Sequence, residues 1–155
     1  MMRQSRQKVQ ISVIGGSHPD PEFAVLAREA GRAIAASGAV LICGGLGGVM
    51  EEAARGAKER NGLTIGILPD YNKESGNPFI DIVLPTGLGH ARNVLVVASA
   101  DLVVALPGSH GTRSEIAIAL KLGKPVIGVR AWSEFADVHY INDIGDLENT
   151  LLLFF

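Results

Sequence analysis

Two glycine-rich segments of the sequence have the composition of phosphate-binding loops. Each lies between an apolar, strand-like run and a segment with helical spacing. Their candidate ligand-binding residues are Gly44, Gly45, Gly47 and Gly48 in the first, and Gly108, Ser109, His110, Gly111 and Thr112 in the second. Glycine lets the backbone turn sharply and a ligand come close, and the free N–H groups at the start of the next helix attract phosphate. We therefore predict phosphate binding at both loops. The alternative for the first loop is a tight strand–helix turn without a ligand.

The glycine pattern argues against two common nucleotide sites. Residue 50 is Met, so the first loop does not match G-x-G-x-x-G, and the chain lacks G-x-x-x-x-G-K-[ST]. An ordinary dinucleotide site and a P-loop ATPase are therefore disfavoured.

Two charged residues could act on a ligand at these loops. Glu115 lies three residues after Thr112, the spacing of a capping box in which the carboxylate caps its own helix. Alternatively, the Glu115 carboxylate faces the ligand's sugar, and the two roles are compatible. Arg92 lies near the start of another predicted helix, where a cation opposes the helix dipole. An anionic ligand at that edge would explain this placement, whereas the alternative is a solvated surface arginine.

Other reactive side chains give weaker signals. His90 and His110 are expected on the rim of the site, where either could reach a ligand or be an ordinary loop histidine. The four histidines lack the spacing of metal ligands, so we predict no metal site. Cys43 ends an apolar run and is expected in the core. Ser17 and Ser109 lack the G-x-S-x-G context of a serine hydrolase.

Apolar runs and helix-like segments alternate along the chain. Strands are expected at residues 8–14, 39–43, 63–68, 81–84, 101–106 and 125–129, with a weaker one near 138–140. Helices are expected from Pro21 to just before Gly38, from about 49 to 60, at about 88–99, at 112–122 and from about 143. Continuous apolar strands that alternate with helices indicate a parallel sheet covered on both faces. We predict an α/β, Rossmann-like, doubly wound domain spanning residues 1–155, with residues 1–7 flexible.

Ligands of such sheets bind beyond the carboxyl ends of the strands, near the point where the strand order reverses. Loops that follow two further strands should open on the same edge as the two glycine-rich loops. They add Gly15, Gly16, Ser17 and Gly87 to the predicted ligand-binding residues. This convergence is a stronger signal than any one loop.

Composition limits the classes of partner. The chain has 155 residues, and its 14 basic and 16 acidic residues give a net charge of −2, which argues against broad binding of nucleic acid. A single cysteine excludes a disulfide framework. Apolar runs stay shorter than the 18 or so residues of a membrane span, so we expect a cytoplasmic protein with no membrane partner.

The two glycine-rich loops resemble the paired motifs of the LONELY GUY superfamily. The similar segments are CGGLGGVMEEAARGAKE and LPGSHGTRSEIAIALKLGKPV, and the resemblance runs from about Val9 to Arg130. The segment TGLGHARN is more similar to a branch related to the molybdenum cofactor carrier protein of algae. The resemblance implies that Glu115 and Arg92 occupy the positions of the family's catalytic residues. Ser109 replaces a family glycine and Asn93 a family lysine, which argues against a cytokinin-type substrate.

The resemblance implies two hypotheses. The first is a nucleoside 5′-monophosphate phosphoribohydrolase, which releases free base and ribose 5-phosphate. Glu115 would stabilise the positive charge that develops on the ribose or activate water, Arg92 would orient the phosphate or the base, and no cofactor is required. The second is a non-catalytic carrier or sensor of a phosphorylated ligand such as molybdenum cofactor. The resemblance also implies a homodimer or homotetramer, and the apolar tail at residues 151–155 would need cover.

Overall fold

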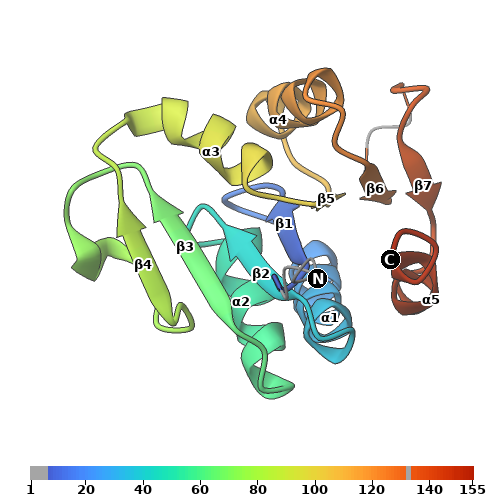
Figure 1. The fold of residues 1–155 in the computed structure, drawn as a ribbon, viewed down its shortest axis with the longest axis horizontal. Coiled ribbons are helices and arrows are strands. Elements are labelled where there is room, and N and C mark those ends of the chain that lie inside the picture. Colours follow the sequence, from blue (N-terminus) through green and yellow to red (C-terminus); the bar gives the residue numbers. More distant parts are fainter. Residues whose placement is uncertain (1–6, 132–133) are drawn as a thin grey trace, which may run out of the picture.

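The computed structural model describes residues 7–131 and 134–155 and places a seven-stranded parallel sheet at their centre (Figure 1). The strands are β1 (Gln10–Ile14), β2 (Val40–Cys43), β3 (Thr64–Leu68), β4 (Ile82–Pro85), β5 (Leu102–Ala105), β6 (Val126–Val129) and β7 (His139–Ile141). Their spatial order is β4-β3-β2-β1-β5-β6-β7. The chain builds outward from β1 to β4, returns to the other side of β1 with β5, and thus reverses the strand order between β1 and β5.

Helices cover both faces of the sheet (Figure 1). One face carries α1 (Pro21–Ala36), α2 (Val49–Glu59) and α5 (Leu147–Leu151), and the other carries α3 (Arg92–Ala98) and α4 (His110–Lys121). Short 3-10 turns occur at η1 (Lys73–Ser75), η2 (Gly89–Ala91) and η3 (Ile144–Asp146). The predicted Rossmann-like, doubly wound architecture is confirmed, including the weaker strand and helix near the C-terminus. Of the segment predicted to be flexible, residues 1–6 lie outside the described part.

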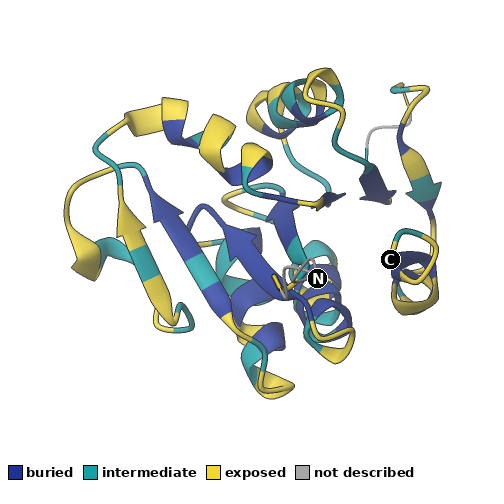
Figure 2. Cartoon of the chain, viewed as in Figure 1, coloured by how far each residue is buried: buried dark blue, intermediate teal, exposed yellow. Residues whose placement is uncertain are grey.

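The core consists of two apolar layers, one on each side of the sheet. Along β5, Leu102 and Val104 belong to the layer under α1, α2 and α5, whereas Val103 and Ala105 belong to the layer under α3 and α4. Successive side chains of a strand point to opposite faces, so a strand that is covered on both sides must be apolar throughout. Figure 2 shows the result as a buried central sheet between half-exposed helices. This rigid layer holds the loops at the carboxyl ends of the strands.

Two glycines let α1 and α2 pack backbone to backbone. A Cβ atom on Gly31 of α1 would lie 1.9 Å from the Ala53 carbonyl oxygen of α2. A Cβ atom on Gly56 of α2 would lie 1.9 Å from the Arg28 carbonyl oxygen of α1. Any larger residue at either position must therefore push the helices apart.

The edge strand β4 and the C-terminal tail both expose apolar side chains. Ile82 and Leu84 of β4 are exposed. In the tail, Leu151 is buried, whereas Leu152 and Leu153 are exposed. Part of the tail therefore packs on its own chain, and the predicted oligomer remains a prediction. Among the described residues no helix is long and apolar enough to cross a membrane.

Candidate functional site

A cavity of about 560 Å³ lies beyond the carboxyl ends of β1, β2 and β5, where the strand order reverses. We call it the main cavity. Its predicted lining residues are Gly15, Gly16, Ser17, Gly44, His90, Arg92, Ser109, Gly111, Thr112 and Glu115. Its volume lies within the range of about 300–1,000 Å³ that is typical of small-molecule sites. The topology thus brings both charged candidates and residues of all four glycine-containing loops to one hollow.

Other predicted binding residues do not line the main cavity. They are Gly45, Gly47, Gly48, Gly87, Gly108 and His110. Gly87 has a positive φ of 66° and packs against the Tyr71 ring. A ligand role for these six residues stays a prediction.

The first turn of α4 offers unpartnered hydrogen-bond donors to the main cavity. Helix α4 begins at His110, and its N-cap residue Ser109 makes no side-chain cap hydrogen bond. Within the described chain, the N–H groups of residues 110–112 have no acceptor. Thr112 is 3% exposed as a residue, and its hydroxyl has no hydrogen-bond partner among the described residues. A buried hydroxyl without a partner is costly, so this turn is suited to an anionic ligand.

The predicted capping box is wrong. It requires Thr112 at the N-cap position, but the helix begins two residues earlier, so Thr112 lies in the first turn. Glu115 therefore lies at the wall of the main cavity and does not cap the helix.

The first glycine-rich loop mainly holds other loops in place. Gly48 has a φ of 70°, and a Cβ atom there would lie 2.3 Å from the Ser17 carbonyl oxygen. The N–H group of Val49, the first residue of α2, donates to the Gly16 carbonyl oxygen at 3.0 Å. Gly45 packs against Gly66 and Leu68 of β3. A tight structural turn thus describes most of this loop, and Gly44 alone among its four predicted glycines lines the main cavity.

Arg92 is buried and fixed by hydrogen bonds to three acceptors. It is 8% exposed. Its Nε donates to the Ile67 carbonyl oxygen at 2.9 Å, its Nη2 donates to the Gly44 carbonyl oxygen at 3.3 Å, and its Nη1 donates to the Asn93 side chain. Burial lowers the pKa of the guanidinium below its usual value. Arg92 is therefore not a solvated surface arginine.

Glu115 faces the main cavity from α4. Burial raises the pKa of its carboxyl to about 7, and the positive charge of Arg92 acts in the opposite direction. At neutral pH the carboxyl group is therefore poised between its protonated and ionised forms, as an acid–base group should be.

The walls of the main cavity include residues that the sequence analysis did not propose. They are Val13, Ile14, Leu46, Met50, Pro69, Gly89 and Asn93. Met50 lies two residues after the first glycine-rich loop, and Asn93 directly follows Arg92. Their nearness in sequence to predicted site residues is the signal that could have identified them. The described residues contain no group of three or more His, Cys, Asp and Glu side chains that could hold a metal ion.

Known proteins that are similar to this chain are named either for molybdenum cofactor or for a nucleoside monophosphate. The model of the SLOG cluster4 family matches residues 8–151. The molybdenum cofactor binding protein of the phototrophic bacterium Rippkaea orientalis is 37% identical, with a TM-score of 0.90 over 96% of this chain and 98% of that one. The molybdenum cofactor carrier protein of Chlamydomonas reinhardtii is 33% identical, with a TM-score of 0.88 over the same shares of the two chains.

A sequence relative has an enzymatic name. The cytokinin riboside 5′-monophosphate phosphoribohydrolase of Mycobacterium marinum is 30% identical, and the match covers 79% of this chain and 75% of that protein. The relatives thus include both a hydrolase and carriers.

Proposed function

Because the chain belongs to the SLOG cluster4 family, we propose that its main cavity binds a small, nucleotide-like phosphorylated ligand, with the phosphate on the first turn of α4. The observation that carries this proposal is the buried, unpartnered Thr112 hydroxyl beside the free N–H groups of residues 110–112. A phosphate oxygen would accept hydrogen bonds from these donors and favour the positive end of the helix dipole.

Replacing Thr112 by Val tests this phosphate site. Valine keeps the shape of the side chain and removes the hydroxyl. A hydrogen bond to a charged group contributes about 1.5–3 kcal/mol, so we expect the affinity for AMP and for inorganic phosphate to fall at least about tenfold, without loss of stability. Isothermal titration calorimetry measures this change.

Ser114→Ala is the matched control for that experiment. Its hydroxyl lies on the same helix, donates to the Gly111 carbonyl oxygen and is exposed. The Ser114→Ala protein should bind phosphate ligands as the wild type does. Equal affinities of Thr112→Val and wild type would show that the phosphate does not rest on this turn.

A carrier of a phosphorylated cofactor such as molybdenum cofactor is the first candidate for the biological role. It is supported by the solved relatives, which match this chain over almost their whole length. The main cavity fits such cargo in two respects, since it offers donors for the phosphate and a volume of about 560 Å³ for the rest of the molecule. A carrier needs no turnover, and in it Arg92 and Glu115 would position the cargo.

Hydrolysis of a nucleoside 5′-monophosphate is the second candidate. The observation that favours it is Glu115, whose pKa is about 7 and which faces the same cavity as the phosphate-binding turn. Ionised Glu115 would stabilise the positive charge on the ribose as the glycosidic bond breaks, or would take a proton from the attacking water. Buried Arg92 would keep the carboxylate partly ionised at neutral pH.

The pH dependence of base release distinguishes the two candidates. A pKa raised to about 7 keeps Glu115 protonated below that pH. If ionised Glu115 is required, kcat/KM should be about tenfold lower at pH 6 than at pH 8, and Glu115→Gln should abolish turnover while it keeps AMP binding. The assay follows free base from a panel of nucleoside 5′-monophosphates. Absence of release across the panel excludes the hydrolase for those substrates and leaves the carrier.

A further inference from the structure

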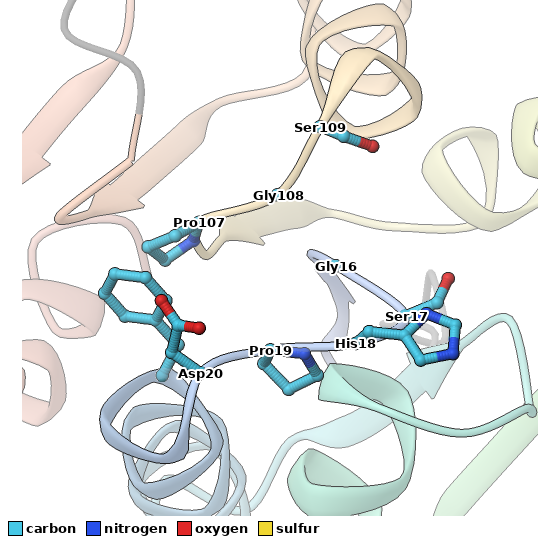
Figure 3. A pocket seen from close by; sticks show the side chains of 9 residues that line it. Gly16, Ser17, His18, Pro19, Asp20, Pro107, Gly108 and Ser109 are labelled. Carbon is cyan, nitrogen blue, oxygen red and sulfur yellow. The ribbon is translucent and has the colours of Figure 1, made fainter.

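A second cavity of about 420 Å³ lies next to the main cavity, between the start of α1 and the loop after β5. Figure 3 shows its two sides, with Gly16 to Asp20 facing Pro107 to Ser109 across the hollow. The function proposed above does not use this space.

The two cavities meet at a wall made of glycine backbone. Gly16, Ser17 and Ser109 line both cavities. The Gly16 N–H donates to the Pro107 carbonyl oxygen at 3.1 Å, and a Cβ atom on Gly16 would lie 3.5 Å from the Gly108 Cα. Because no side chain stands on this wall at Gly16 or Gly108, a ligand held at Ser109 can extend to either side.

The second cavity has the chemistry of a ring-binding site. Phe23, Pro19 and Pro107 supply apolar surface, whereas neither Lys nor Arg lines it, which disfavours another phosphate deep inside. The Phe23 ring is held from outside the cavity lining by Arg130, whose guanidinium lies 5.9 Å from the ring centroid. A flat, fixed aromatic ring is a stacking surface for a heterocycle.

Asp20 gives this cavity a hydrogen-bond acceptor. It is the N-cap residue of α1, but its side chain makes no cap hydrogen bond. Its carboxylate extends from the start of α1 into the space opposite Pro107 (Figure 3). It is free to accept from the amino group of a purine or pterin ring.

We propose that the second cavity binds a heteroaromatic ring that is joined through a pyrophosphate to the group in the main cavity, so that the full ligand is of the dinucleotide class. This inference rests on the proposed function, because it needs a phosphate on the first turn of α4. The pyrophosphate would lie at Ser17 and Ser109, which both cavities share. The arrangement differs from an ordinary dinucleotide site, in which a G-x-G-x-x-G loop presents the helix after the first strand. Here that helix, α1, begins with Pro21, which lacks an N–H group.

Calorimetric titration with three kinds of probe tests this inference. The probes are AMP and GMP, then ADP and GDP, and then diadenosine and diguanosine 5′,5′-pyrophosphate. We expect at least one dinucleotide to bind ten or more times more tightly than its nucleoside diphosphate. Phe23→Leu, which keeps apolar volume but removes the aromatic face, should erase this gain and leave mononucleotide affinity unchanged. Val25→Ala is the control, since Val25 is an exposed residue of the same helix.

The outcomes separate this inference from the function on which it rests. Thr112→Val should weaken every probe, whereas Phe23→Leu should weaken the dinucleotide alone. If mononucleotides bind in a Thr112-dependent manner but neither dinucleotide exceeds its diphosphate, or if Phe23→Leu leaves the gain intact, the second cavity is not a ring site. If no probe binds the wild type, the proposed nucleotide-like ligand fails, and this inference fails with it.

Discussion

Arg92→Ala should weaken binding of phosphorylated ligands, because it removes a positive charge from the wall of the main cavity, and should lower the free energy of unfolding by roughly 2–6 kcal/mol. The substitution leaves the carbonyl oxygens of Ile67 and Gly44 without their donor, and each buried group left unsatisfied costs about 1–3 kcal/mol. It also removes the positive charge that lowers the pKa of Glu115. That pKa should therefore rise above 7, and most Glu115 side chains should be protonated at neutral pH.

Urea denaturation and titration with AMP measure the two effects of Arg92→Ala. Arg55→Ala is the matched control, because Arg55 is a half-exposed arginine that pairs with Glu52 on the surface of α2, and such pairs contribute about 0–1 kcal/mol. Arg92→Lys keeps the charge but cannot bond three acceptors in the same geometry, so its stability should lie between those of wild type and Arg92→Ala. Wild-type stability and affinity in Arg92→Ala would show that the buried guanidinium supports neither the fold nor the site.

Gly56→Ala should destabilise the protein by about 3 kcal/mol, the upper part of the range for overpacking a well-packed core. In an isolated helix the change would be favourable by about 1 kcal/mol, since alanine has the higher helix propensity. Here the added Cβ atom would lie 1.9 Å from the Arg28 carbonyl oxygen of α1. The two helices must separate to make room, and this weakens the contacts that both helices make with the sheet.

Gly47→Ala is the control for this second prediction. A Cβ atom at Gly47 meets nothing within 4 Å, so its stability should stay within about 0.5 kcal/mol of wild type. Thermal and urea unfolding of both variants give the comparison. A Gly56→Ala protein that is more stable than wild type would mean that helix propensity outweighs the close contact of α1 with α2.

The fold was predictable because its signals are local. β-Branched and apolar runs mark each strand, and Gly38 and Gly123, with φ of 82° and 72°, end α1 and α4 as helix-terminating glycines do. The alternation of these elements then determines a parallel sheet, whose carboxyl edge collects the loops.

The details of the site were less predictable because they depend on contacts between distant segments. Arg92 is fixed by carbonyl oxygens 25 and 48 residues away in the chain, and nothing near it in sequence indicates that it is buried. The T-x-x-E pattern indicated a capping box, but α4 begins at His110 and leaves Thr112 free for a ligand. In the first loop Gly48 packs against the loop after β1, Gly45 packs against strand β3, and Gly47 faces solvent. Composition alone does not distinguish these structural roles from phosphate binding.

A crystal structure of the protein with a nucleoside 5′-monophosphate tests the central claim most directly. We predict that the phosphate lies in the main cavity, with its oxygens about 2.6–3.2 Å from the Thr112 hydroxyl and from N–H groups of residues 110–112, which is hydrogen-bond distance. The sugar should face Glu115. A phosphate bound away from α4, or a main cavity that stays without ligand at millimolar nucleotide, would contradict the proposed phosphate site.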